Sequence, residues 1–120
     1  MPDSPSQGPL EQSPQGQSPE EIVVRQEEPE GSRRGRFAVY VDGVEAGEMT
    51  YFRRKPELIV IDHTGVPKEY GGRGLGQRLV AAAVEATRAA GHKIRPLCPF
   101  VRAVMKRTEA YHDVLEAPLT

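Results

Sequence analysis

The stretch best suited to chemistry is a glycine-rich loop that runs into an alanine-rich segment. Its glycines are Gly71, Gly72, Gly74 and Gly76. Glycine adopts backbone angles that other residues avoid, and without a Cβ atom it lets a ligand approach the main-chain N–H groups. Unpaired N–H groups in the first turn of a helix favour a bound anion by about 0.3–1 kcal/mol per interaction, and Arg73 adds a forked donor. The stretch 66–78 therefore predicts a phosphate-binding site. The alternative is a loop that only turns a strand into a helix.

The spacing within the loop excludes two familiar nucleotide sites. The run GGRGLG lacks the G-x-G-x-x-G spacing of a dinucleotide fold. No acidic residue lies about 20 positions further on at the end of a second parallel strand. A P-loop is excluded because the run does not end in Gly-Lys-Ser/Thr.

Hydrophobic periodicity predicts the strands that position the loop. They lie at 22–26, 36–41, 46–53 and 58–61. The last of them is apolar throughout, as expected of a central strand buried on both faces. Asp42-Gly43 predicts a tight hairpin turn after the second strand.

Two helices are predicted after the loop. Apolar residues at helical spacing predict the first over 75–90, ended by Gly91 as a left-handed cap, and the second over 100–107. An extended segment at 93–97 separates them, and 111–115 could return as a strand. The order hairpin, strand, loop, helix, strand, helix predicts an α+β domain rather than a βαβ series.

Length and charge predict one small, moderately basic domain. The chain has 120 residues and a formal net charge of -1. Residues 1–31 hold seven acids and one arginine, or -6, which leaves 15 bases and 10 acids, or +5, in residues 32–120. This charge suits an anionic small ligand and is too weak to predict DNA binding by itself.

Composition also predicts the domain boundary and the compartment. Residues 1–21 read as a disordered tail rich in Pro, Ser and Gln, and residues 22–120 as the domain. Cys98 is the single cysteine, so no intrachain disulfide and no metal site is expected. No apolar run approaches the roughly 18 residues of a membrane span, and the N-terminus lacks the features of a signal peptide. We therefore expect a cytoplasmic protein with no membrane partner.

The glycine loop resembles motif A of the GNAT acetyltransferases. That motif is a strand, a loop of the form (Arg/Gln)-x-x-Gly-x-(Gly/Ala) that binds the pyrophosphate of acetyl-CoA, and a helix. Gly74 and Gly76 occupy its two small positions. Gly71 stands where the family has Arg or Gln.

A second set of residues resembles a minimal GNAT-like subfamily. The pair HT at 63–64 and the run PLCPFV at 96–101, followed by Tyr111, carry this resemblance. Members of the subfamily lack the N-terminal helices that usually shape the acceptor site. The resemblance covers about residues 22–116.

The resemblance implies both a fold and a co-substrate. The fold is a GNAT-like mixed, mostly antiparallel sheet with two main helices, and the co-substrate is acetyl-CoA. The main chain around Val66 would bind the pantetheine arm and polarise the thioester carbonyl, and the amides of 72–77 would hold the pyrophosphate. The implied cofactor-binding residues are Val66, Gly71, Gly72, Arg73, Gly74, Leu75, Gly76 and Gln77.

Acyl transfer to an amine requires a group that removes a proton. An amine with a pKa of about 10.4 is neutral in only about one molecule in 2,500 at pH 7, equivalent to roughly 4.6 kcal/mol. His63 could accept that proton because histidine titrates near neutrality, or it could be structural and bonded to Asp62 or to the backbone. Tyr111 could protonate the leaving thiolate or pack in the core.

Cys98 is a candidate acyl-accepting nucleophile. It precedes the second predicted helix, whose dipole would favour the thiolate form. The alternatives are a small buried residue beside the cofactor and direct transfer without an acyl-enzyme.

The sequence thus predicts an N-acetyltransferase, an acyltransferase that acts on amino groups. The acceptor would be a small-molecule or protein amine, such as a polyamine or a lysine, and the protein a monomer or weak dimer. A non-catalytic acyl-CoA-binding sensor module is the alternative. A nucleic-acid-binding domain is a weaker third option, so nucleic acid is not expected as a partner.

Overall fold

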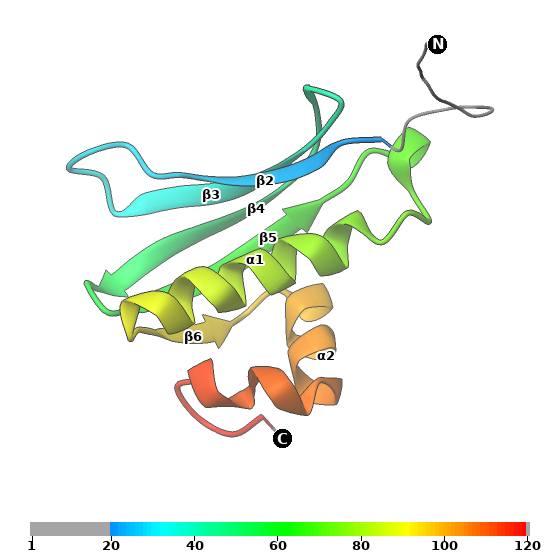
Figure 1. Ribbon diagram of the computed structural model, residues 1–120. Coiled ribbons are helices and arrows are strands. Elements are labelled where there is room, and N and C mark those ends of the chain that lie inside the picture. Colours follow the sequence, from blue (N-terminus) through cyan, green and yellow to red (C-terminus); the bar gives the residue numbers. More distant parts are fainter. Residues whose placement is uncertain (1–19, 120) are drawn as a thin grey trace, which may run out of the picture.

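The computed structural model describes residues 20–119. The predicted tail at 1–21 lies outside these residues, apart from Glu20 and Glu21. Within 20–119, the chain forms a five-stranded sheet with two main helices (Figure 1). This confirms the predicted α+β class.

The sheet is antiparallel except at one edge. Its strands, in spatial order, are β2 (Ile22–Glu27), β3 (Arg34–Val41), β4 (Val44–Lys55), β5 (Leu58–Gly65) and β6 (Lys93–Pro96). The first four pair antiparallel, and β6 pairs parallel to β5. The predicted turn joins β3 to β4, with Asp42 and Gly43 at φ angles of 50° and 84°. Both angles are positive, as a two-residue hairpin turn requires.

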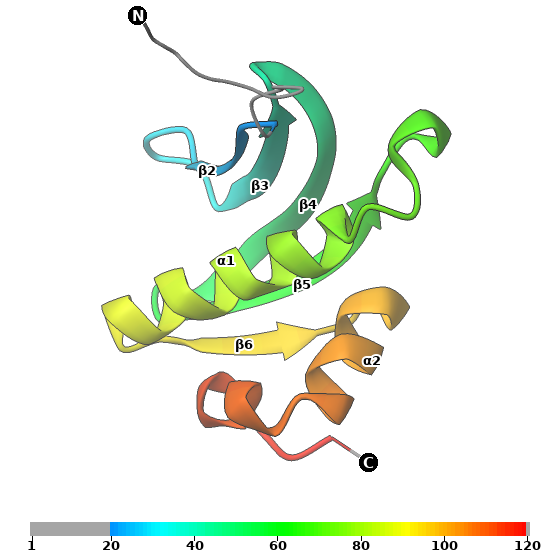
Figure 2. The same cartoon turned by 45° about the vertical axis from the view of Figure 1, so that its right-hand side comes forward.

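The first helix follows the predicted limits. α1 (Leu75–Ala90) ends at Gly91, which has φ 73° and donates its amide to the carbonyls of Arg88 and Thr87. α1 lies across one face of the sheet, and α2 (Pro99–Arg107) packs beside it at the ends of β5 and β6 (Figure 2). A 3-10 turn, η1 (Lys68–Tyr70), lies in the loop before α1.

The prediction of a strand at 111–115 is wrong. This segment forms a 3-10 helix, η2 (Glu109–Val114), and only Leu115 forms an isolated bridge, with Ile94 of β6. One residue separates η2 from α2, and the amide of Tyr111 bonds to the carbonyl of Thr108. The chain therefore turns back beneath α2 and reaches the edge of the sheet only after the predicted segment is nearly finished.

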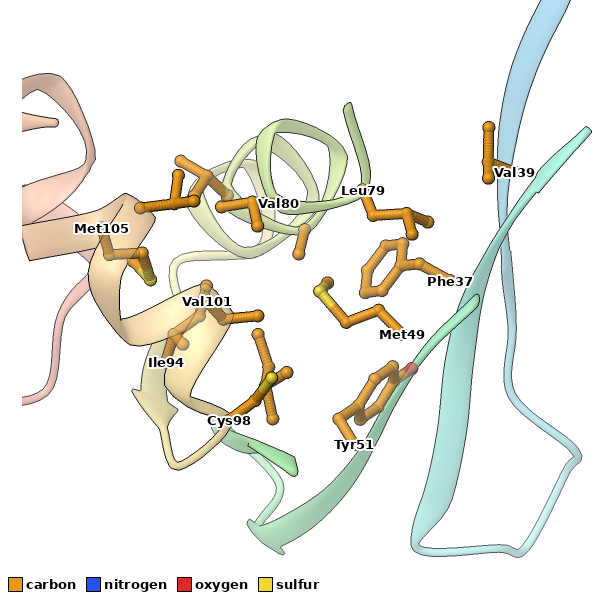
Figure 3. Packing of buried hydrophobic residues seen from close by; sticks show 14 of the residues in the cluster. Phe37, Val39, Met49, Tyr51, Leu79, Val80, Ile94, Cys98, Val101 and Met105 are labelled. Carbon is orange, nitrogen blue, oxygen red and sulfur yellow. The ribbon is translucent and has the colours of Figure 1, made fainter. Parts of the chain in front are cut away.

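The core lies between the sheet and the two helices. Phe37 and Met49 of the sheet meet Leu79 of α1, and the Phe37 and Tyr51 rings lie 5.6 Å apart (Figure 3). All four residues of 58–61 are buried, as predicted for a strand covered on both faces. No helix within residues 20–119 is long and apolar enough to cross a membrane.

Candidate functional site

A cavity of about 480 Å³ opens between the end of β5, the glycine loop, the first turn of α1 and the start of α2. Its walls are formed by Thr64, Val66, Tyr70, Gly71, Gly72, Gly74, Leu75, Gly76, Gln77 and Phe100. Seven of the eight predicted cofactor-binding residues therefore lie together. The exception is Arg73.

Two of the glycines are needed for different reasons. Gly74 is the N-cap of α1 and has φ 74°, in the left-handed region that favours glycine. Gly76 lies inside the first turn of α1, where a Cβ atom would stand 2.7 Å from Cζ of Phe100. The aromatic ring therefore packs directly on the helix backbone and forms one wall of the cavity.

The N-terminus of α1 suits an anion. No side chain caps it, and its first turn holds no acidic residue. The amide of Arg78 already bonds to the Gly74 carbonyl, so the amides at Leu75, Gly76 and Gln77 precede the first helical hydrogen bond. The Gly71 amide differs, because it bonds to the carbonyl of Lys68.

Arg73 contacts the N-terminal segment instead of lining the cavity. Its Nη1 lies 3.1 Å from both carboxylate oxygens of Glu20, and its guanidinium stands 5.4 Å from the centre of the Tyr70 ring. Glu20 precedes Arg73 by 53 residues, so no local pattern could have predicted the pair.

The cavity also has an apolar wall, to which Tyr70 and Phe100 contribute although neither was predicted to bind the cofactor. Val66, Tyr70, Leu75 and Phe100 supply this wall, and the Thr64 hydroxyl lies among them. Thr64 and Phe100 lie in the HT pair and the PLCPFV run that carry the family resemblance, but neither was predicted to bind or react. Tyr70 had no signal beyond its place in the glycine loop.

Cys98 does not line the cavity, but it contacts Thr64, which does. It is the N-cap of α2, as predicted, and is only 6% exposed. Its Sγ donates a hydrogen bond to Thr64 Oγ1 at 3.4 Å. The amides of Leu97 and Cys98 both bond to the Ile61 carbonyl, which fixes the end of β6 against β5.

His63 lies on the other face of the sheet. It pairs with Thr50, whereas Thr64 pairs with the buried Met49. Residues paired across two strands share a face, so Thr64 faces the core and His63 faces away from it. His63 is exposed, and a Cβ atom on Gly65 would stand 3.1 Å from its Nε2, so the imidazole lies over Gly65.

Asp62, the suggested structural partner of His63, bonds elsewhere. It accepts hydrogen bonds from the Thr50 hydroxyl at 2.6 Å and from Arg34 at 2.9 Å. Burial raises the pKa of the Asp62 carboxyl, but the hydrogen bonds it accepts and the positive charge of Arg34 together hold that pKa below its ordinary value. Asp62 is therefore held as a carboxylate on the polar face of the sheet.

Tyr111, like Cys98 and His63, is not among the residues that line the cavity. It is half-buried on η2 and packs against the core. This position favours the packing role among the two that the sequence left open. Residues 20–119 contain no group of three or more His, Cys, Asp or Glu side chains that could hold a metal ion.

A comparison with protein families identifies the family of this chain. The model of a family described as GCN5-related N-acetyl-transferase matches residues 36–114. The chain belongs to this family. None of the curated proteins compared with this GCN5-related chain matches it.

Solved structures share the fold of this GCN5-related chain. A GCN5-like protein from Staphylococcus aureus, solved by NMR, is 31% identical, with 82% of this chain and 90% of that chain covered and a TM-score of 0.60. AAC(6')-Iy, solved with a bisubstrate analogue of CoA, is 14% identical, with 83% and 94% covered and a TM-score of 0.54. A GNAT acetyltransferase from Elizabethkingia anophelis, solved with acetyl-CoA, is 10% identical, with 61% and 62% covered and a TM-score of 0.51. This chain thus spans less than two thirds of the Elizabethkingia protein.

Proposed function

We propose that the protein is an N-acetyltransferase that uses acetyl-CoA. The observation that carries the proposal is the cavity at the uncapped N-terminus of α1. Gly76 leaves room there for the Phe100 ring, and the first turn of the helix has no acidic residue that would repel an anion. Two proteins with this fold were solved with acetyl-CoA or a CoA analogue. The residues of the cavity fit such a ligand, which has phosphates at one end and a long arm at the other.

Each part of the cavity would hold a different part of acetyl-CoA. The amides of Leu75, Gly76 and Gln77 would bind the pyrophosphate, because they precede the first hydrogen bond of the helix. Val66 and Phe100 would pack against the pantetheine arm. Gly71 has no side chain, and its amide already donates a hydrogen bond to the Lys68 carbonyl. Binding of the phosphates would therefore depend on the amides of the helix.

The transfer itself would be direct. The amine nitrogen forms a bond to the acetyl carbon, the carbon–sulfur bond breaks, and CoA leaves as a thiolate that takes a proton from solvent. The proton lost by the nitrogen would go to His63, whose imidazole lies over Gly65, next to Val66 in the chain, and which is exposed and could pass the proton to water. The products are an acetamide and CoA. Burial of Cys98 behind Thr64 supports direct transfer over an acyl-cysteine.

Replacement of Cys98 by alanine separates these two routes. With direct transfer, Cys98→Ala loses less than about tenfold in kcat/KM, or about 1.4 kcal/mol. Intact mass spectrometry of wild-type protein mixed with acetyl-CoA alone then shows no added acetyl group. Cys98→Ser, which can keep the hydrogen bond to Thr64, serves as the control. An acetylated wild type together with an inactive alanine variant would establish the nucleophile instead.

Replacement of Glu20 by glutamine is expected to tighten acetyl-CoA binding. The Glu20 carboxylate now occupies Arg73, and its loss leaves the guanidinium available to a phosphate of the ligand. Because both side chains are exposed, calorimetry should show a Kd only about two- to fivefold lower. Glu21→Gln, next in the chain, is the control for net charge, and the difference should shrink in 1 M salt, where the Debye length is about 3 Å. Equal effects of the two substitutions would contradict a specific contact.

Calorimetry and turnover test the function as a whole. Acetyl-CoA should bind with measurable heat, and CoA should be released when a panel of amines is added. Binding without turnover on any amine would favour the non-catalytic sensor, and absence of both heat and thermal shift would refute both ideas.

A further inference from the structure

A second cavity, of about 430 Å³, lies beside the cavity proposed for acetyl-CoA. It is lined by Glu45, Gly47, Glu48, Gly65, Val66 and Pro67. Val66 belongs to both cavities, so a single residue forms a wall between them. An acceptor bound here would stand next to the strand end where the acetyl group is proposed to lie.

Close approach of two strands forms the floor of this second cavity. A Cβ atom on Gly47 would stand 3.1 Å from the Gly65 carbonyl oxygen and 3.1 Å from Cγ2 of Val66. Glycine is therefore required where β4 meets the end of β5. His63 is not one of the lining residues, but its imidazole lies over Gly65, which is one of them. The proposed proton acceptor thus lies on the same side of the sheet as this cavity.

The charge of the second cavity is negative. Glu45 and Glu48 are the charged residues among the six that line it. Arg36 donates to both carboxylates at 2.9 Å, and also to Glu27 at 2.9 Å. The positive charge of Arg25 also acts on Glu27, so two arginines face three carboxylates. Hydrogen bonds from Arg36 hold the pKa of the Glu45 carboxyl below its ordinary value.

We propose that the second cavity binds the acceptor, and that the acceptor is a small aliphatic diamine or polyamine. The proposal rests on the function proposed above. One amino group would stand beside Val66 and His63, where it loses its proton and attacks the acetyl carbon. The second, still an ammonium, would lie on Glu45 and Glu48, because the three carboxylates of this group outnumber the two arginines and favour a further cation. The size of the cavity suits a small molecule.

Matched amines test the role of the second charge. 1,4-Diaminobutane and 1-aminobutane have the same chain length and one reactive primary amine in common, but only the first carries a second ammonium. We expect kcat/KM for the diamine to exceed that for the monoamine by about tenfold or more, since about 1.4 kcal/mol corresponds to a factor of ten. The ratio should fall to within about threefold in Glu48→Gln and in Glu45→Gln, while the Kd for acetyl-CoA stays unchanged. Glu57→Gln, an exposed glutamate in the turn after β4, should keep the wild-type ratio.

A binding measurement gives an outcome that does not depend on turnover. Addition of 1,4-diaminobutane should shift the NMR amide signals of Gly47 and Gly65 in wild type, and much less in Glu48→Gln. Thermal melts of each variant establish that it is folded. Equal kcat/KM for the two amines, no change of ratio in the glutamine variants, or acetylation of lysine peptides only would each overturn the proposal. Diamine binding without acetyl-CoA binding would refute the proposed function but retain the amine site.

Discussion

Replacement of Gly74 by valine weakens acetyl-CoA binding by roughly tenfold or more. Gly74 has φ 74°, where a residue with a Cβ atom costs about 1–2 kcal/mol, and a β-branched residue costs more. The loop can relieve this strain only by moving the backbone that leads into α1. That movement displaces the amides of Leu75, Gly76 and Gln77, which we propose bind the pyrophosphate. Calorimetry with acetyl-CoA measures the loss directly.

A matched glycine separates strain from ligand binding. Gly31, in the turn between β2 and β3, has φ 80° and open space where a Cβ atom would stand. Gly31→Val should therefore lose stability to a similar extent, yet bind acetyl-CoA with the wild-type Kd. Equal affinity losses in the two variants would mean that global destabilisation, rather than loop geometry, weakens binding.

Replacement of Leu79 by alanine lowers the free energy of unfolding by about 2–5 kcal/mol. Leu79 is fully buried and packs α1 onto Phe37 of the sheet (Figure 3). The loss is large because the removed methyl groups leave a cavity that the sheet cannot fill by collapsing. Urea denaturation followed by circular dichroism measures it.

The control for this core substitution is the same change at an exposed leucine. Leu97 is 56% exposed, and Leu97→Ala should alter the free energy of unfolding by less than about 0.5 kcal/mol. If Leu79→Ala cost no more than Leu97→Ala, α1 would not be held to the sheet by this contact.

Most of the secondary structure could be predicted because its signals are local. The alanine-rich helix has apolar residues at helical spacing and ends at Gly91, and its observed limits agree with the predicted ones. The Asp42-Gly43 turn fixes its hairpin in the same way. The prediction of a strand at 111–115 failed, because a short segment with mixed polar and apolar residues does not by itself distinguish a strand from a helical turn.

The position of the glycine loop before α1 could likewise be predicted from the sequence, because its glycines are close together in the chain and the helix N-terminus follows directly. The role of Gly76 could not, since its contact with Phe100 joins two helices. The carboxylates beside Val66 were also missed. Glu48 stands opposite Gly65 only because β4 pairs with β5, and pairing across strands has no local signature.

The sequence by itself determined the α+β class, the limits of α1 and the glycine loop that leads directly into its first turn. Only the tertiary structure decided which side chains at the end of β5 face the core and which face away from it. Thr50 pairs with His63 and Tyr51 with Ile61, which leaves Asp62 as an extra residue in β5. This bulge shifts the alternation of side chains by one position. As a result Thr64, rather than His63, shares the core side with Ile61, and His63 faces away from the core.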